Sequence, residues 1–89
     1  MDTAENAETM GKEERKQQVL QILNESGLAL TPYVLFRNAK MRGSTFERRT
    51  LSNYLAELVD EGRVEKIEQE EETNLYRITE KGRESLSTS

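Results

Sequence analysis

Residues 50–64 read TLSNYLAELVDEGRV, and this stretch decides the fold. Its apolar residues recur at the spacing of one face of an α-helix, and they are Leu51, Leu55, Leu58 and Val59. Gly62 follows them, and glycine readily adopts the positive φ with which many helices end. Thr50 can accept a hydrogen bond from a free N–H group at the helix start. The stretch therefore predicts an amphipathic helix over residues 50–61.

A second possible start for this helix lies a short distance upstream. Ser44 and Glu47 have the spacing of a capping box, in which the two side chains satisfy free backbone N–H groups reciprocally. Phe46 lies off the apolar stripe, so the apolar period favours the later start. We therefore take Thr50 as the N-cap and expect Phe46 to anchor the preceding turn.

Downstream, two β-prone runs flank a polar tip. Residues 64–68 alternate in polarity and residues 75–78 read LYRI. Two such runs around a polar loop are typical of a β-hairpin. A short helix over residues 80–86, capped by Thr79, is expected to follow.

Upstream, two further helices are expected. Residues 12–26 again have apolar positions at helical spacing, and these are Val19, Leu20, Ile22 and Leu23. Residues 28–30, which read LAL, are expected to form a brief extended piece. Residues 31–32 read TP, a strong helix start because proline fits the first helical position. This second helix is expected to bury Leu35 and Ala39.

The chain is predicted to form one domain over residues 12–86. Residues 1–11 lack an apolar period and are expected to form a disordered tail, and residues 87–89 a short C-terminal tail. The second helix is expected to end near Met41. The predicted fold class is α+β, with a three-helix core, a short strand and a C-terminal β-hairpin.

The composition excludes several kinds of site. The chain has no cysteine and no histidine, which rules out a disulfide framework and a thiolate metal site and removes the commonest general base. The glycines are scattered and form no phosphate-binding loop. Adjacent glutamates at 70–72 lack the ligand spacing of a calcium loop. We expect no enzyme activity, no metal and no cofactor.

No part of the sequence points to a membrane. No apolar run approaches the roughly 20 residues that a membrane-spanning helix requires. Residues 1–10 lack the positive charge and apolar stretch of a signal peptide. The expectation is a soluble, cytoplasmic protein without membrane contact.

The net charge of −4 is unevenly distributed along the chain. Residues 33–56 hold five basic residues and one acidic residue, a net charge of +4. Residues 57–89 hold five basic and ten acidic residues, a net charge of −5. A basic island in an acidic chain is a possible electrostatic footprint for a polyanion, although chance clustering explains it equally well.

Residues 50–64 resemble the recognition helix and first wing strand of winged helix-turn-helix proteins. Residues 76–84, which read YRITEKGRE, resemble the returning wing strand with its Thr-x-x-Gly-Arg exit. Residues 30–46 are similar to the same part of archaeal phage-repressor-like transcriptional regulators. The resemblance covers roughly residues 12–86. It implies a sequence-specific, repressor-like regulator of double-stranded DNA whose third helix enters the major groove.

The resemblance places the DNA contacts on the third helix and the turns before it. The candidate DNA-binding residues are Arg42, Arg48, Arg49, Thr50, Ser52, Asn53 and Tyr54. The residues off the apolar stripe, expected to face outward, are Ser52, Asn53, Ala56 and Glu57. Arg48 and Arg49 are placed to hold phosphates, helped by the positive end of the helix dipole. Asn53 can pair bidentately with adenine, although it also fits as a plain surface residue, and Tyr54 either reaches a phosphate or packs beside the wing.

The wing departs from the family's common pattern. DNA-binding wings usually carry Lys or Arg at the tip, whereas this tip carries Glu68 and residues 70–72, all glutamate. Phosphates repel carboxylates, so the wing is expected to stay out of the minor groove unless Lys66 or Arg77 leans in. The alternative function is therefore a protein-interaction adaptor that uses the acidic wing.

DNA binding is favoured over the adaptor, because the sequence around the third helix is basic. The regulator is expected to be a homodimer, because a single module reads few base pairs and palindromic half-sites mirror a two-fold axis. The first helix and the segment around Leu86 are both open as the dimer element.

Overall fold

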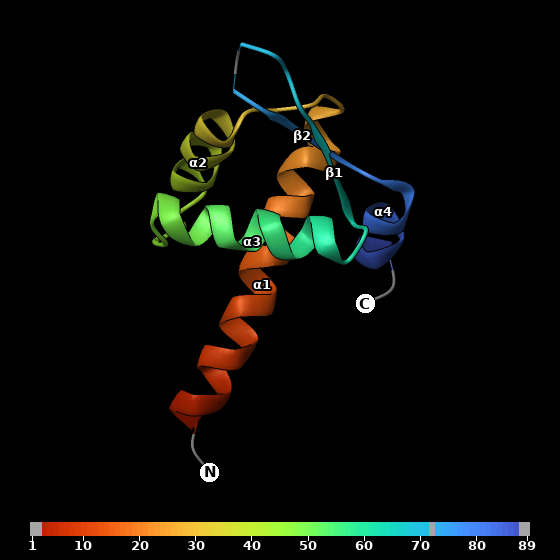
Figure 1. Ribbon diagram of the computed structural model, residues 1–89. Coiled ribbons are helices and arrows are strands. Elements are labelled where there is room, and N and C mark those ends of the chain that lie inside the picture. Colours follow the sequence, from red (N-terminus) through yellow and green to blue (C-terminus); the bar gives the residue numbers. More distant parts are fainter. Residues whose placement is uncertain (1–2, 72, 88–89) are drawn as a thin grey trace.

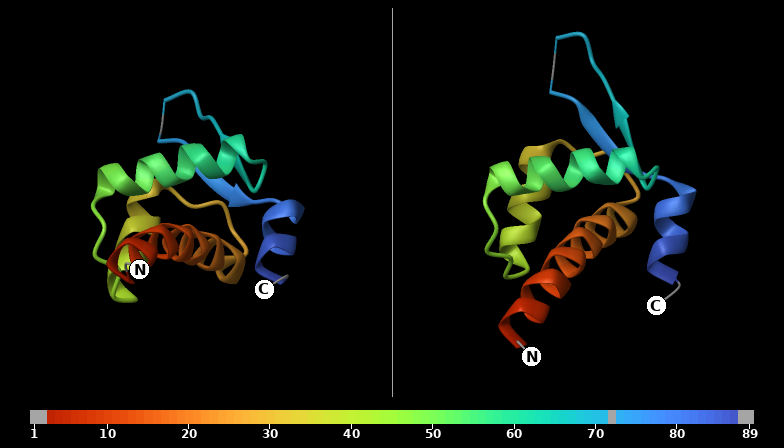
Figure 2. Two further views of the ribbon diagram at one scale, coloured as in Figure 1. Left: turned by 90° about the horizontal axis from the view of Figure 1, so that it is seen from below. Right: turned by 60° about the horizontal axis from the view of Figure 1, so that its bottom comes forward.

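The computed structural model of the protein describes residues 3–71 and 73–87. The elements in chain order are α1 (Thr3–Ser26), α2 (Pro32–Met41), α3 (Arg48–Asp60), β1 (Val64–Ile67), β2 (Leu75–Ile78) and α4 (Glu80–Ser87). Helices α1 and α3 cross, with α2 on one side and α4 on the other, and the β1–β2 hairpin projects from this core (Figure 1, Figure 2). The predicted α+β arrangement is confirmed.

The core forms where the apolar stripes of the three main helices meet. The fully buried side chains are Val19, Leu20, Leu23, Leu35, Leu51, Leu55 and Leu58. Val64 and Ile78, which pair across the base of the hairpin, close one side of this cluster. Burying a Leu or Val side chain contributes roughly 1.5–3 kcal/mol, so the helical stripes carry most of the stability of this small domain. Leu35 and Ala39 are the buried residues of α2, as predicted.

The hairpin is an antiparallel pair with Val64 opposite Ile78 and Ile67 opposite Leu75. The extended piece before α2 adds to it through Leu30. The Leu30 N–H donates to the Tyr76 carbonyl at 2.9 Å, and the Tyr76 N–H donates to the Leu30 carbonyl at 2.8 Å. These two bonds fix the connection from α1 to α2 to the free edge of β2. The brief extended piece predicted for residues 28–30 is thereby confirmed at Leu30.

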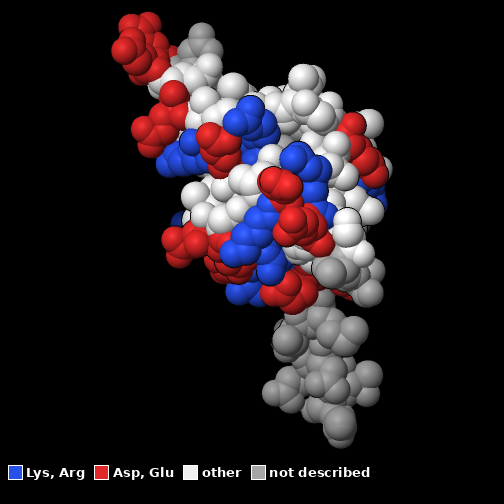
Figure 3. Space-filling view, turned by 90° about the vertical axis from the view of Figure 1, so that its right-hand side faces the viewer, with Lys and Arg blue, Asp and Glu red and all other residues white. Residues whose placement is uncertain are grey.

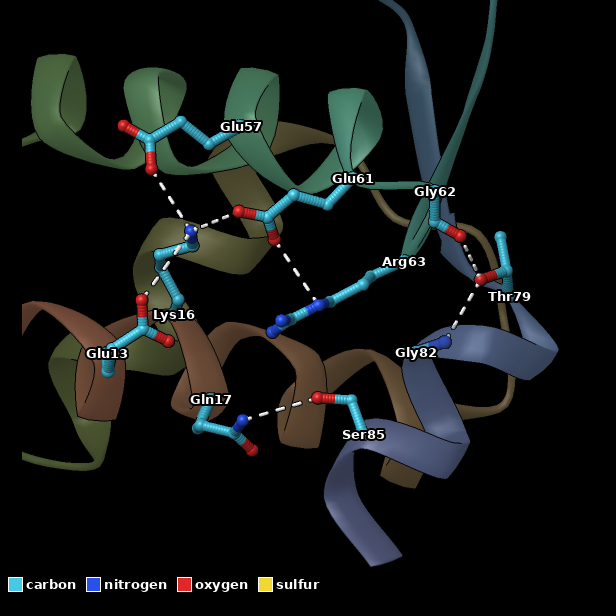
Figure 4. Close-up of polar contacts among 10 residues, drawn as sticks. All are labelled: Glu13, Lys16, Gln17, Glu57, Glu61, Gly62, Arg63, Thr79, Gly82 and Ser85. Atoms are coloured by element: carbon cyan, nitrogen blue, oxygen red, sulfur yellow. Dashed lines mark hydrogen bonds and ion pairs between the residues drawn. The ribbon is translucent and has the colours of Figure 1, made fainter. Parts of the chain in front are cut away.

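The base of the hairpin is closed by the Thr-x-x-Gly segment. The Thr79 hydroxyl donates to the Gly62 carbonyl at 2.7 Å and accepts from the Gly82 N–H at 3.1 Å, which caps α4 (Figure 4). A Cβ atom at Gly82 would lie 2.3 Å from the Arg63 carbonyl oxygen and 2.7 Å from Ile78 Cγ1. Glycine is therefore required at position 82 because the backbones of α4 and the start of β1 approach so closely.

The first helix begins earlier than predicted. It starts at Thr3 rather than at Lys12, so residues 3–11, expected to be a disordered tail, continue the helix. Alanine, glutamate and methionine dominate this segment and are strong helix formers, which propagate a helix without an apolar stripe. This part of α1 projects beyond the body of the molecule (Figure 1). The remaining two residues of the expected tail lie outside the described residues.

The third helix also begins earlier than predicted. It starts at Arg48, and its N-cap is Glu47, whose side chain makes no capping hydrogen bond. Phe46 is buried and packs edge-on against Tyr54, with ring centroids 5.5 Å apart. This aromatic contact fixes the chain just before the helix, so packing rather than a side-chain cap sets the start. Thr50 is a residue of the first turn and not the N-cap.

The C-terminal end differs slightly from the prediction. Helix α4 runs through Ser87, and residues 88–89 of the expected tail lie outside the described residues. In the described part of the chain, no helix has both the length and the apolar character to cross a membrane.

Candidate nucleic-acid interface

The outward face of α3 is polar and open to solvent. Ser52, Asn53 and Ala56 are exposed, opposite a buried stripe that includes Leu51 and Leu55. The helical period produces this separation, because residues one and two positions beyond a stripe residue turn away from the core. The structure brings Ser52 and Asn53 together near the start of the helix, as predicted.

The first turn of α3 is basic. Arg48 and Arg49 are exposed, and neither forms an ion pair with another described side chain. No acidic residue lies in this turn, although Glu47 precedes it. The first backbone N–H groups of a helix have no partner within the helix, and the helix dipole is positive there. The two guanidinium groups and these N–H groups form a site suited to an anion such as a phosphate.

Three of the other candidates are less available to DNA. Tyr54 is only 5% exposed and packs in the core against Phe46, which leaves little of its side chain for a contact with DNA. The spacing of the leucines from Leu51 to Leu58 did not predict the burial of Tyr54, because Tyr54 lies one position beside the apolar stripe and widens it. Arg42 is exposed at the end of α2 but forms an ion pair with Glu25 of α1. Thr50 is half-buried in the first turn of α3.

Helix α2 contributes further basic side chains. Arg37 and Lys40 are exposed. The Lys40 ammonium lies 5.5 Å from the centre of the Phe36 ring, a distance suited to a cation–π interaction. Lys40 precedes the turn that leads to α3, so α2 extends the basic character of the candidate surface.

The opposite side of α3 carries an ion-pair network around the buried side chain of Lys16, which the sequence analysis missed. Lys16 Nζ of α1 donates to Glu57 Oε1 at 3.1 Å and to Glu61 Oε2 at 2.8 Å (Figure 4). Lys12 Nζ lies 3.2 Å from the other oxygen of Glu57. Glu57 was expected to face outward with Ser52 and Asn53, and the structure instead turns it toward α1.

A signal for this network was present in the sequence. Lys16 lies three and four positions before Val19 and Leu20, so it occupies the buried stripe of α1. Its side chain is 3% exposed. A lysine on a buried stripe requires acidic partners, because an unpaired buried charge is costly.

The protonation properties of the network favour the charged pair. Burial lowers the pKa of Lys16, but the hydrogen bonds to Glu61 and Glu57 outweigh it, and the pKa is raised above its usual value. The hydrogen bonds from Lys16 and then Lys12 lower the pKa of Glu57. The stability due to Glu57 is therefore lost as the pH falls through its lowered pKa, and that due to Lys16 as the pH rises through its raised pKa.

In the described part of the hairpin, each of the two cations lies near a carboxylate. Arg77 pairs with Glu65 across the two strands at 2.6 Å, and Lys66 lies 4.0 Å from Glu68. Glu70 and the neighbouring Glu71 are exposed, and Glu72 of the predicted acidic tip lies outside the described residues. On the side of the molecule in Figure 3, basic and acidic side chains are interleaved and form no patch of one sign.

The sequence matches no protein-family model and no curated protein. Among solved structures, RosR of H. salinarum is similar, with 28% sequence identity and a TM-score of 0.69 over 80% of this chain and 64% of RosR. The ferric uptake regulator of F. tularensis, solved with iron, gives 20% identity and a TM-score of 0.67 over 73% of this chain and 50% of the regulator. That of H. pylori gives 17% identity and a TM-score of 0.70 over 84% of this chain and 51% of the regulator.

These matches establish the fold. The chain has the winged-helix fold. It spans less than two thirds of the length of each matched protein. The matches support the winged-helix family but give no support to the expected likeness to phage repressors. The H. pylori regulator has three functional metal-binding sites, whereas the described residues here contain no group of three His, Cys, Asp or Glu side chains that could hold a metal ion.

Proposed function

We propose that the chain binds double-stranded DNA through the outward face of α3 and regulates transcription. The observation that carries the proposal is the first turn of α3, where Arg48 and Arg49 have no partner among the described side chains. Other exposed cations, among them Arg42 and Arg77, are paired with carboxylates. The first turn of α3 combines two cations without such a partner with the free N–H groups of a helix start, which suits it to a polyanion. The likeness to RosR and to proteins named as ferric uptake regulators agrees with a regulatory role.

In the proposed complex, α3 lies in the major groove. Arg48 and Arg49 hold phosphates and fix the register, without carrying sequence information. Asn53 accepts and donates hydrogen bonds at one base edge, for which adenine is the best partner. Ser52 contacts a neighbouring base or phosphate, and Thr50, half-buried in the first turn, is restricted to a phosphate.

Several finer features of the function belong to the same proposal. A repressor-like homodimer that reads two half-sites would supply the specificity that one short helix lacks. Arg42 would join the DNA contacts only by releasing Glu25, and so it ranks below Arg48 and Arg49. The hairpin stays out of the minor groove, because its cations are already paired and its tip is acidic.

A binding assay on random-sequence duplex DNA at several salt concentrations tests the proposal. Arg48→Ala and Arg49→Ala should each weaken binding and lower the slope of log affinity against log salt by about one. Lys81→Ala is the matched control, since it removes the same charge from an exposed site on α4 that has no ion pair among the described residues. A parent protein that binds no duplex, or variants that bind like the Lys81 control, would reject α3 as the DNA face.

A protein-interaction adaptor is the second candidate function. The exposed glutamates at the hairpin tip favour it, because they would attract a basic protein segment and repel DNA. The two functions differ in which charges matter. Replacing Glu70 and Glu71 by Gln should abolish partner binding by an adaptor, whereas the Arg48 and Arg49 changes should leave it intact.

A further inference from the structure

The C-terminal half of α3 poses an electrostatic problem for DNA binding. It carries Glu57 and Asp60, and Glu61 follows as the C-cap. Three carboxylates on a helix that lies in the major groove would repel the phosphates on either side. In the structure two of them do not face outward, because Glu57 and Glu61 both accept hydrogen bonds from the ammonium of Lys16.

We propose that Lys16 is a positioning residue for the DNA face, whose buried ammonium holds the carboxylates of Glu57 and Glu61 on the α1 side of α3. The outward face formed by Ser52, Asn53 and Ala56 thereby carries neither of these two carboxylates, and Asp60, which is exposed one turn after Ala56, is the carboxylate that remains on this side of α3. The inference rests on the proposed function of α3, but the position of the two carboxylates can be measured without DNA.

The exposures in the network support this role. Lys16 is 3% exposed, whereas the side chains of Glu57 and Glu61 are 39% and 37% exposed. Two partly solvated carboxylates are thus tied to one buried group. Without the Lys16 ammonium, each carboxylate would become better solvated by turning toward water. The solvent-exposed side of α3 is the candidate DNA face, so the carboxylates would then lie nearer to the DNA.

The other contacts of these carboxylates are weaker or more exposed. Among the described side chains, Glu57 would keep only Lys12 as a partner, and the Lys12 side chain is 51% exposed. Glu61 keeps Arg63, whose Nε lies 3.3 Å from Glu61 Oε1. Glu13 of α1 also faces Lys16, at 4.0 Å, but it lies on the same helix as Lys16 and does not connect to α3. Lys16 is therefore the group that connects both carboxylates to α1.

The first test is an NMR titration of the side-chain carboxyl groups in the parent and in Lys16→Met, which keeps the apolar stem of the side chain. The Glu57 carboxyl should titrate at a higher pH in Lys16→Met, because its first hydrogen-bond donor is lost. Lys12→Met should shift it less. An unchanged Glu57 titration in Lys16→Met would overturn the inference, whatever the protein does with DNA.

The second test is duplex DNA binding. Lys16→Met should weaken binding about tenfold at low salt, and by much less at high salt, where exposed charges are screened. Adding Glu57→Gln and Glu61→Gln to Lys16→Met should restore binding to within about twofold of the parent, because the repelling charges are gone. Glu13→Gln, the matched control, should leave binding unchanged.

The outcomes separate the two proposals. If the parent binds no duplex, the proposed function fails, and the titration still decides whether Lys16 holds the two carboxylates. If Lys16→Met binds like the parent while folded, or if the two Gln changes restore nothing, the positioning role is wrong. Should Lys16→Met fail to fold, the triple variant remains informative, because it leaves no unpaired carboxylate in the network. Parent-like binding by that variant supports the inference, and weak binding by the folded triple variant rejects it.

Discussion

The first turn of α3 and the tip of the β1–β2 hairpin are both exposed, and they handle charge in opposite ways. On α3, Arg48 and Arg49 have no described partner. On the hairpin, Arg77 is paired with Glu65 and Lys66 lies near Glu68, which leaves the tip acidic. A winged helix can bring both parts to DNA, but of the two only the first turn of α3 presents cations that are not paired with described carboxylates. The contrast in cation pairing therefore favours the first turn of α3 over the hairpin as the surface that meets a phosphate.

The two regions also differ in how firmly the core holds them. Helix α3 buries Leu51, Leu55 and Leu58 completely, whereas the hairpin buries only its base. A reading helix must keep its geometry on a rigid support, because a small displacement removes base contacts. A projecting acidic tip has no such requirement.

The largest expected effect tests this difference in anchoring. Leu55→Ala should lower the free energy of unfolding by about 2–5 kcal/mol, because it removes buried methyl groups and leaves a cavity. Ile67→Ala in the half-buried part of β1 should cost clearly less. Chemical denaturation followed by circular dichroism measures both. Equal losses would mean that the hairpin is anchored as firmly as α3.

The next prediction concerns the joint that connects the hairpin to α4. Gly82→Ala should lower the free energy of unfolding by about 1–3 kcal/mol, because its Cβ would collide with the Arg63 carbonyl. Gly11→Ala is the control, since it adds the same methyl group within α1, where nothing lies within 4 Å. That change should stabilise by about 0.5–1 kcal/mol through helix propensity. A neutral Gly82→Ala would mean that α4 can move away from β1 at little cost.

Much of this arrangement could be predicted from the sequence, because its signals are local. The helical spacing of Leu51, Leu55 and Leu58 fixed which side of α3 is buried, and so which side is outward. The residues TP at 31–32 predicted the start of α2, and the alternating run at 64–68 predicted the first strand of the hairpin. Each of these depends on neighbours within two turns of the chain.

The features that could not be predicted depend on side-chain contacts outside the local helical pattern. Glu57 was expected to face outward, and its partner Lys16 lies on another helix. The sequence left Tyr54 open between a phosphate contact and packing beside the wing, and its ring packs on Phe46. The start of α3 was placed at a good capping residue, but the structure caps it without a side chain. In each case a tertiary contact outweighed the local preference.

The third prediction separates positioning from reading on α3. Arg49→Ala should weaken binding to all duplexes by similar factors and lower the salt slope by about one. Asn53→Ala should instead cost about 1–3 kcal/mol on the preferred site alone and leave the salt slope nearly intact. Both side chains are exposed, so circular dichroism should show unchanged folding. Identical effects of the two changes on specific and random duplexes would remove Asn53 from the reading residues.

The smallest expected effect is at the hairpin tip, and it tests the other side of the comparison. Glu70→Gln combined with Glu71→Gln should leave DNA affinity unchanged or raise it by about twofold to threefold, since it removes two negative charges at some distance from the phosphates. Both residues are exposed, and they have no ion pair with another described side chain.

The salt dependence of that gain identifies its origin. An electrostatic gain should fade as salt rises, because exposed charges are screened beyond a distance of roughly 10 Å at 0.1 M ionic strength. A substitution of Glu65 would not be a suitable test of the tip, because it would remove one negative charge and also leave Arg77 without its ion-pair partner. Loss of specific binding in the Glu70 and Glu71 variant would give the acidic tip an active part in recognition, and the contrast between α3 and the hairpin would then no longer separate a DNA-binding surface from an inert one.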